Sequence, residues 1–145
     1  MIDVLDLTNH SHINRLKLFS MLEHPPTFRY FKNRIFEEAI KGHQLTLLYR
    51  NDEQKDIGYA HIDLDDKTKR MFFGICILTQ YQNKGVGSEL IKFTLNTYNG
   101  PLYLTVDDNN LPAINLYNKF NFTKIENYGT YSLWHIMKNN SSNKV

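Results

Sequence analysis

Along the chain, apolar positions recur with a period near 3.6 in some stretches and a period of two in others, which is typical of alternating helices and strands. Helical spacing predicts helices at Ser11–Leu22, Tyr30–Lys41, Gly85–Tyr98 and Pro112–Phe120. Strands are expected at Ile2–Leu7, Gln44–Tyr49, Ile57–Leu64, Met71–Leu78, Leu102–Val106, Phe122–Glu126 and Thr130–Met137. The order β-α-α-β-β-β-α-β-α-β-β combines hairpins with one β-α-β crossover. It therefore predicts an α/β (α+β) fold in which helices cover both faces of a mixed sheet.

The third and fourth predicted strands form a hairpin at the centre of this order. Along the third strand, the side chains that share one face are Tyr59, His61 and Asp63. The fourth, Met71–Leu78, is apolar on both faces, as a strand covered on both sides should be. If Asp65–Thr68 forms the whole turn of this hairpin, Asp63 lies opposite Arg70 as a structural ion pair. A one-residue shift would instead turn these side chains to the other face.

Composition narrows the class of protein. The chain has 145 residues, of which 41% are hydrophobic and 22% charged, as in one globular domain. We expect a single domain at 1–138 and a flexible polar tail at 139–145. The net charge of +2 gives no support for a nucleic-acid partner held by bulk charge. The start shows no secretory signal, and no apolar run approaches the roughly 20 residues of a membrane span, which predicts a cytoplasmic protein without a membrane partner.

Metal chemistry is not expected either. The single cysteine, Cys76, excludes a disulfide framework and a cysteine-rich zinc site. The six histidines show no ligand spacing, so we predict no metal site. Cys76 itself is expected to be a buried, unreactive thiol.

The most informative segment joins the central strand to the next helix. Its residues are Gln82, Asn83, Lys84, Gly85, Val86 and Gly87. Glycines at 85 and 87 allow the backbone to approach a ligand, and the helix N-terminus adds partial positive charge. Together they suit a pyrophosphate, to which Lys84 could add a full charge. The alternative is a tight turn with close helix–sheet packing. Leu90 stands where a dinucleotide fingerprint needs a third small residue.

This segment resembles the Gln/Arg-x-x-Gly-x-Gly/Ala coenzyme A motif of the GCN5-related N-acetyltransferases (GNAT). The stretch 106–122 also resembles that family, and the matching residues are Asn110, Ala113, Ile114, Leu116, Tyr117, Lys119 and Phe122. The two motifs lie about 25 residues apart, and the resemblance covers about 71–137. The sequence departs from the family at Asn121, which replaces a glycine. It also lacks the carboxylate that many relatives carry near Met71 or Phe73.

The resemblance implies a mostly antiparallel sheet of about six or seven strands with a splayed central pair. It implies transfer of an acetyl group from acetyl-CoA to a primary amine by direct attack in a ternary complex. By analogy, the Ile75 amide polarises the thioester carbonyl and Ile77 pairs with the pantetheine arm. The amides of 82–87 hold the pyrophosphate, and Asn110 binds pantetheine. Tyr117 would protonate the leaving thiolate. Its alternative role is a core aromatic on a helix face.

The resemblance does not assign the general base or the acceptor amine. His61 is a candidate base or acceptor-site residue, because histidine titrates nearest neutrality, and otherwise a half-buried strand histidine. His24, beside two prolines, is a candidate acceptor contact. The remaining histidines, His10, His12, His43 and His135, are interpreted as structural or solvated.

The aromatic first third of the chain suits stacking on a sugar ring. Tyr59, Asp63 and Arg29 are candidate acceptor contacts. Arg29 or Arg34 could pair with the phosphate of a nucleotide-linked amino sugar, unless both are solvated helix residues. The alternatives to a small amine are a protein or peptide acceptor, or a non-catalytic acyl-CoA-binding module. A homodimer is left open.

Overall fold

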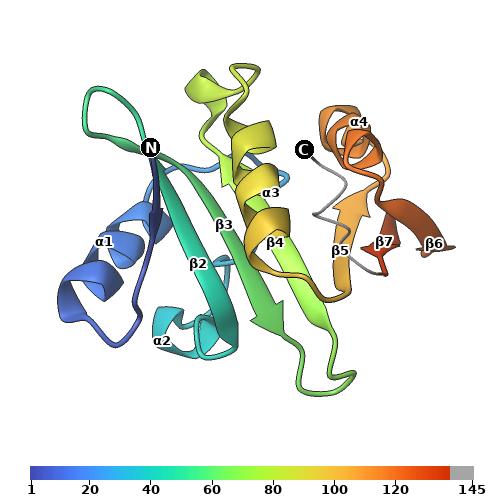
Figure 1. The fold of residues 1–145 in the computed structure, drawn as a ribbon, viewed down its shortest axis with the longest axis horizontal. Coiled ribbons are helices and arrows are strands. Elements are labelled where there is room, and N and C mark those ends of the chain that lie inside the picture. The colour runs from blue at the N-terminus through green and yellow to red at the C-terminus, as the bar shows by residue number, and fades with distance from the viewer. Residues whose placement is uncertain (138–145) are drawn as a thin grey trace.

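The computed structural model describes residues 1–137, which form a seven-stranded sheet flanked by helices (Figure 1). The strands are β1 (Ile2–Val4), β2 (His43–Arg50), β3 (Asp56–Leu64), β4 (Met71–Ile77), β5 (Leu102–Asp107), β6 (Thr123–Asn127) and β7 (Tyr131–Ile136). Their order in the sheet is β1-β2-β3-β4-β5-β7-β6, and every neighbouring pair is antiparallel except β4 and β5. The predicted mixed, mostly antiparallel sheet is confirmed. The predicted tail, 139–145, lies outside the described residues.

The helices are α1 (His10–Ser20), α2 (Phe36–Ala39), α3 (Val86–Thr97) and α4 (Leu111–Lys119), with a short 3₁₀ turn at Thr79–Tyr81. The Asn9 side chain caps α1 by accepting from the amides of Ser11 and His12. None of the helices in 1–137 is both long and apolar enough to cross a membrane.

The predicted helix Tyr30–Lys41 is wrong for most of its length, because only Phe36–Ala39 is helical. Asn33 adopts a left-handed conformation, with φ of 59°, which interrupts a right-handed helix. The aromatic rings of this segment pack on β3, where Phe31 lies 5.6 Å from the ring of Tyr59. Tertiary packing therefore takes precedence over the local periodicity.

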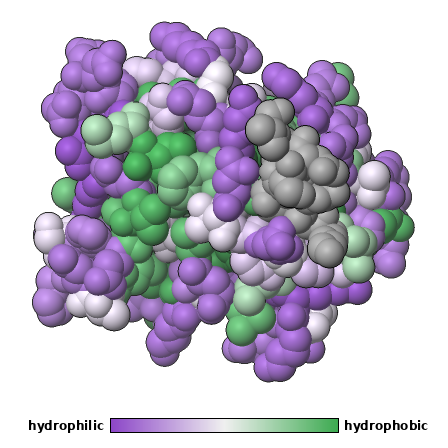
Figure 2. Space-filling model, in the orientation of Figure 1, coloured by the Kyte–Doolittle hydropathy of each residue, from purple (hydrophilic) through white to green (hydrophobic). Residues whose placement is uncertain are grey.

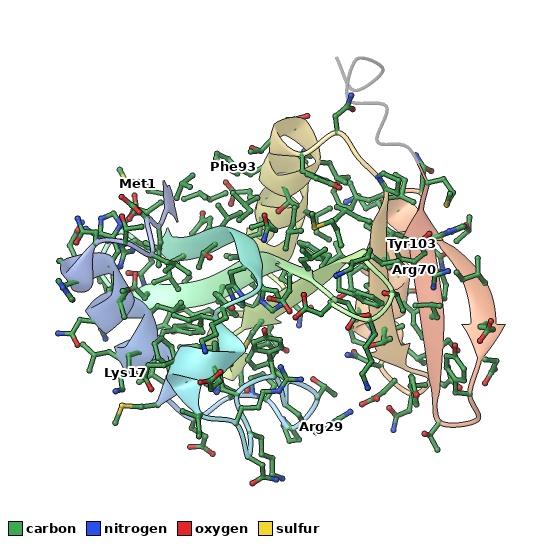
Figure 3. The ribbon with its side chains drawn as sticks, turned by 90° about the horizontal axis from the view of Figure 1, so that it is seen from below. Met1, Lys17, Arg29, Arg70, Phe93 and Tyr103 are labelled. Atoms are coloured by element: carbon green, nitrogen blue, oxygen red, sulfur yellow. The ribbon has the colours of Figure 1, made fainter. Side chains whose placement is uncertain are left out.

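The helices divide between the two faces of the sheet (Figure 3). On the α3 side, Ala60 and Ile62 of β3 pack with Leu90 and other buried residues. On the α1 side, Tyr59 packs with Phe19 and other buried residues. Because Tyr59 and Ala60 are consecutive but belong to opposite cores, the predicted alternation along β3 is confirmed. Helices on both faces are confirmed as well.

Helix α3 leaves part of its own face of the sheet open. Figure 2 shows apolar side chains gathered over β1 and β2, beside α3. Val4 is 51% exposed there, and Ile2, Leu45 and Tyr49 are half-buried against the α3-side core. The most buried strand of the sheet is β3, in which every residue from Ile57 to Ile62 is buried.

The β3–β4 hairpin differs in register from the simple prediction. Asp63 lies opposite Phe72, not Arg70, because the turn is longer than Asp65–Thr68. Lys69, with φ of 59°, extends it, and the Lys69 amide donates to the Asp65 carbonyl. The Arg70 guanidinium instead lies 4.4 Å from the ring centre of Tyr103 on β5 (Figure 3).

Candidate active site

A cavity of about 990 Å³ occupies the gap between β4 and β5. Within residues 1–137 these two strands pair at a single position, Phe72 with Tyr103, so they diverge beyond it. The predicted splayed pair is confirmed. The walls come from the segment 25–34, β4, the loop 81–88, α4 and the ends of β3 and β5. Because α3 covers one face and the segment 25–34 the other, the cavity passes through the sheet.

The loop before α3 offers main-chain donors to this cavity. Gly85, with φ of 84°, is the N-cap of α3, and no side chain caps the helix. The amides of the first helical turn, at Val86, Gly87 and Ser88, are therefore available to an anion. A Cβ at Gly87 would lie 3.2 Å from Leu116 Cδ2 on α4. Glycine at position 85 therefore permits the left-handed turn, and glycine at position 87 permits the close approach of α3 and α4.

The other predicted residues of this loop differ in their placement. Asn83 and Gln82 line the cavity, and the Gln82 side-chain amide donates to the Ile77 carbonyl at 3.1 Å. Lys84 does not line the cavity, and its Nζ lies 5.9 Å from the ring centre of Tyr81. A direct Lys84 contact to a ligand in the cavity would require that side chain to move.

The register of β4 directs two amides into the gap. The Leu78 amide donates to the Ile57 carbonyl on β3 at 2.9 Å. Amide directions alternate along a strand, and the β3–β4 register is unbroken. The amides of Ile75 and Ile77 therefore point away from β3, toward the space that β5 leaves. These are the two positions that the sequence resemblance implied.

Tyr117 and Asn110 both reach the cavity from α4 and its cap. Tyr117 is 6% exposed, and burial raises the pKa of its phenol, so the hydroxyl keeps its proton at neutral pH. Asn110 is the N-cap of α4, and its Oδ1 accepts from the Ala113 amide at 3.4 Å. At the other end of α4, Asn121 has φ of 70°, so it provides the left-handed turn expected where the family has glycine.

His61 lies on the cavity wall beside the central strand. It is 4% exposed, and its Nδ1 is buried without a hydrogen-bond partner among residues 1–137. A Cβ at Gly74 would lie 2.5 Å from His61 Cε1, so the imidazole rests against β4 next to Ile75. Burial, and then the nearby His43 and Arg34, lower the pKa of His61 well below its ordinary value. The ring is therefore neutral near pH 7, so one of its two nitrogens keeps a lone pair.

The candidate acceptor residues Asp63 and Tyr59, both on β3, differ in their access to the cavity. Asp63 lines the cavity, whereas Tyr59 is fully buried outside its wall. The Tyr59 hydroxyl bonds to His43 Nε2, and burial raises its pKa. Direct contact between Tyr59 and a ligand in the cavity is therefore excluded by its position.

His24 does not line the main cavity. It lies in a neighbouring hollow of about 340 Å³, and its Nε2 bonds to the Phe19 carbonyl at 2.9 Å. Burial lowers the pKa of His24. Cys76 is buried, and burial raises its pKa to about 12, as expected for an unreactive thiol.

Arg29 and Arg34 line the part of the cavity formed by the segment 25–34, which we call the acceptor end. Neither arginine lies on a helix. Arg29 reaches across the cavity to Asp107 at the end of β5, with two contacts of 3.0 Å (Figure 3 labels Arg29). The pKa of the Asp107 carboxyl is lowered by this guanidinium. The Arg34 guanidinium lies 4.5 Å from the ring centre of Tyr30. No local sequence pattern indicates the Arg29–Asp107 pair, because its partners are 78 residues apart.

A mixed sheet that splays at its parallel pair, with two β4 amides turned into the splay and uncapped amides at the start of α3, is the arrangement that the sequence resemblance implied. Residues 10–122 match the model of the acetyltransferase (GNAT) family. The chain belongs to that family.

Individual relatives agree with this assignment. N-alpha-acetyltransferase 50 of Danio rerio is 26% identical over 138 residues, covering 90% of this chain and 79% of that protein. Spermidine N-acetyltransferase from Vibrio cholerae, solved with CoA and spermine, has a TM-score of 0.71 at 15% identity, over 98% of each chain. The structure of yncA from Salmonella typhimurium with acetyl-CoA has a TM-score of 0.67 at 14% identity, over 94% of this chain and 92% of that chain.

The chain is thus an acetyl-CoA-dependent N-acetyltransferase. Its own residues fit this co-substrate. Uncapped amides at the start of α3 suit the pyrophosphate, and the inward amides of β4 suit an extended amide-bearing arm. No cluster of three or more potential metal ligands occurs in the part of the chain that the structure describes.

Proposed function

We propose that the enzyme acetylates a primary amine of a small molecule, with an amino sugar or a nucleotide-linked amino sugar as the first acceptor to test. The observation that carries this proposal is the bridge between Arg29 and Asp107, which joins the two walls of the acceptor end. A bridged, aromatic-lined end suits a compact acceptor better than an extended polypeptide. Phe28, Tyr30 and Phe72 line it and could stack on a ring.

Asp63 and His61 would receive the amine. The Asp63 carboxylate lines the cavity and would attract an ammonium group. His61, neutral and with an unpaired buried nitrogen, would take the proton that the amine must lose before attack.

Bound acetyl-CoA supplies the acetyl group as a thioester. The Ile75 amide would donate to the thioester carbonyl, where negative charge develops during attack. The Tyr117 hydroxyl, kept protonated by burial, would donate its proton to the departing sulfur. Each role falls on a residue that lines the cavity.

A peptide N-terminus is the second candidate acceptor. It is supported by the 26% identity to N-alpha-acetyltransferase 50. A polypeptide acceptor would require the Arg29–Asp107 bridge to open, since both residues stand on the cavity wall.

The test is a thiol-release assay with acetyl-CoA and a panel of amino sugars, nucleotide-linked amino sugars, polyamines and short peptides. Our proposal predicts the highest kcat/KM with an amino sugar. Turnover restricted to peptides would contradict it and favour the second candidate. Turnover restricted to polyamines would retain the small-molecule class and reject the sugar.

A further inference from the structure

His43, on β2, lies behind Asp63 and His61, the two acceptor-site residues that line the cavity. It has no part in the reaction proposed so far. Its side chain is fully buried, and both ring nitrogens are bonded. Nδ1 lies 2.9 Å from Asp63 Oδ1, and Nε2 bonds to the Tyr59 hydroxyl. Because a carboxylate only accepts, Nδ1 carries the proton in this pair. With the proton on Nδ1, Nε2 accepts from the Tyr59 hydroxyl, which gives a chain of three oriented groups.

This chain fixes two residues that face the cavity. Asp63 is held by its bond to His43, and a Cβ at Gly42 would lie only 2.9 Å from Asp63 Oδ1. The His61 ring is stacked on the His43 ring, with centroids 4.5 Å apart and planes at 24°. The His61 ring also lies against Gly74 and against the Tyr30 ring, whose centroid is 4.4 Å away. Both acceptor-site residues are therefore in contact with His43 and closely approached by a glycine.

We propose that His43, itself held by Tyr59, is a positioning residue of the acceptor site. It keeps the Asp63 carboxylate directed to bind the acceptor ammonium, and it keeps the His61 ring oriented to take the proton. This inference rests on the proposed function.

The ionisable groups around His43 come from two segments. From β3 they are Tyr59, His61 and Asp63. From the segment 25–34 they are Tyr30, whose ring centre lies 5.7 Å away, and Arg34, which lies over the Tyr30 ring. Asp63 is the anion that pairs with His43, so the orientation of one depends on the other.

Three variants separate positioning from simple stability. Tyr59→Phe removes one hydroxyl and leaves the ring. His43→Phe removes both hydrogen bonds and leaves an aromatic ring that can still stack. His43→Asn keeps an amide that can donate to Asp63. Thr94→Val is the matched control, since it deletes a buried hydroxyl bonded to the Leu90 carbonyl at 2.8 Å on the opposite face of the sheet.

The measurement is kcat and KM for the amine and for acetyl-CoA from the lowest pH at which the variants remain folded up to pH 9. We expect Tyr59→Phe and His43→Phe to lower kcat/KM for the amine about tenfold while KM for acetyl-CoA stays unchanged. In His43→Phe the acid limb should move to higher pH, because His61 loses the neighbouring imidazole that lowers its pKa. His43→Asn should recover part of the loss, and Thr94→Val should lower only the melting temperature.

If His43→Phe does not fold, Tyr59→Phe decides the question by itself. An amine kcat/KM and pH profile equal to wild type in the folded variants would overturn the positioning role and leave the proposed function intact. A wild-type enzyme that acetylates no amine would overturn the proposed function and this inference together.

Discussion

Phe72 and Tyr103 form the single register pair between β4 and β5 in residues 1–137. Beyond this pair the two strands diverge around the cavity. The divergence leaves the inward amides of Ile75 and Ile77 without a strand to bond, although each lies on a well-paired strand of the sheet. The site is therefore a consequence of where pairing stops.

The effect of the Gly85 turn on coenzyme binding should be separable from the effect of backbone strain on stability. Gly85→Ala and Gly129→Ala both place a Cβ on a left-handed residue with nothing else within 4 Å. Each should cost about 1 kcal/mol of unfolding free energy, measured by urea denaturation. Only Gly85→Ala should weaken acetyl-CoA binding, measured by calorimetry, because Gly129 lies in the β6–β7 turn. Equal weakening by both would argue against a coenzyme site at the α3 loop.

Removing the Tyr117 hydroxyl should affect chemistry more than binding. We expect Tyr117→Phe to lower kcat about 10²-fold, while KM for acetyl-CoA changes little. Tyr103→Phe, which lies outside the cavity wall, is the control. Because burial raises the Tyr117 pKa, this phenol should produce no basic limb below about pH 10. Unchanged turnover in Tyr117→Phe would remove it from the acid role.

The Arg29–Asp107 bridge should influence the acceptor rather than the coenzyme. Arg29→Ala and Asp107→Ala are each expected to raise KM for the amine several-fold, and the double variant should be no worse than either single one. The unfolding free energy should fall by less than about 1 kcal/mol, because Arg29 is 55% exposed. Lys17→Ala, which breaks the exposed Lys17–Glu37 pair, is the control. Additive losses would show that the two residues act separately.

Acid should destabilise the fold through His61. Above the ordinary histidine pKa of 6.5 the ring is neutral in both folded and unfolded chains. Below it only the unfolded chain takes up the proton, so stability is lost as the pH falls. Between pH 6.5 and 5, wild type should lose up to about 1 kcal/mol per pH unit more than His61→Gln. His24, whose pKa is also lowered, contributes to both proteins equally. The same pH dependence in both would show that His61 is not held neutral.

Features that depend on short stretches of sequence were predictable. The central strand was expected at Met71–Leu78 and is found at Met71–Ile77. The helix after the glycine loop was expected at Gly85–Tyr98 and is found at Val86–Thr97, with Gly85 as its cap. Glycine, cap residues and unbroken apolar periodicity act locally, so the sequence alone carries their effect.

Features that depend on contacts between distant segments could not be predicted from the sequence. The periodicity of Tyr30–Lys41 suits a helix, but its rings pack on Tyr59 and the chain forms mainly turns. His43 reaches Asp63 next to an irregularity in the β2–β3 register between His43 and Leu45. Arg29 meets Asp107 only once the sheet has formed. Each of these depends on a register or a chain path that no local pattern specifies.

Main-chain amides in the splay and in the α3 loop are expected to hold the coenzyme. The most direct test is a backbone amide NMR titration of the protein with acetyl-CoA. We predict that the largest shift changes fall on Ile75, Ile77 and the amides of 85–88, while the turn at Gly129 is unaffected. Binding that leaves these amides unchanged and perturbs another part of the sheet would show that the coenzyme is held elsewhere.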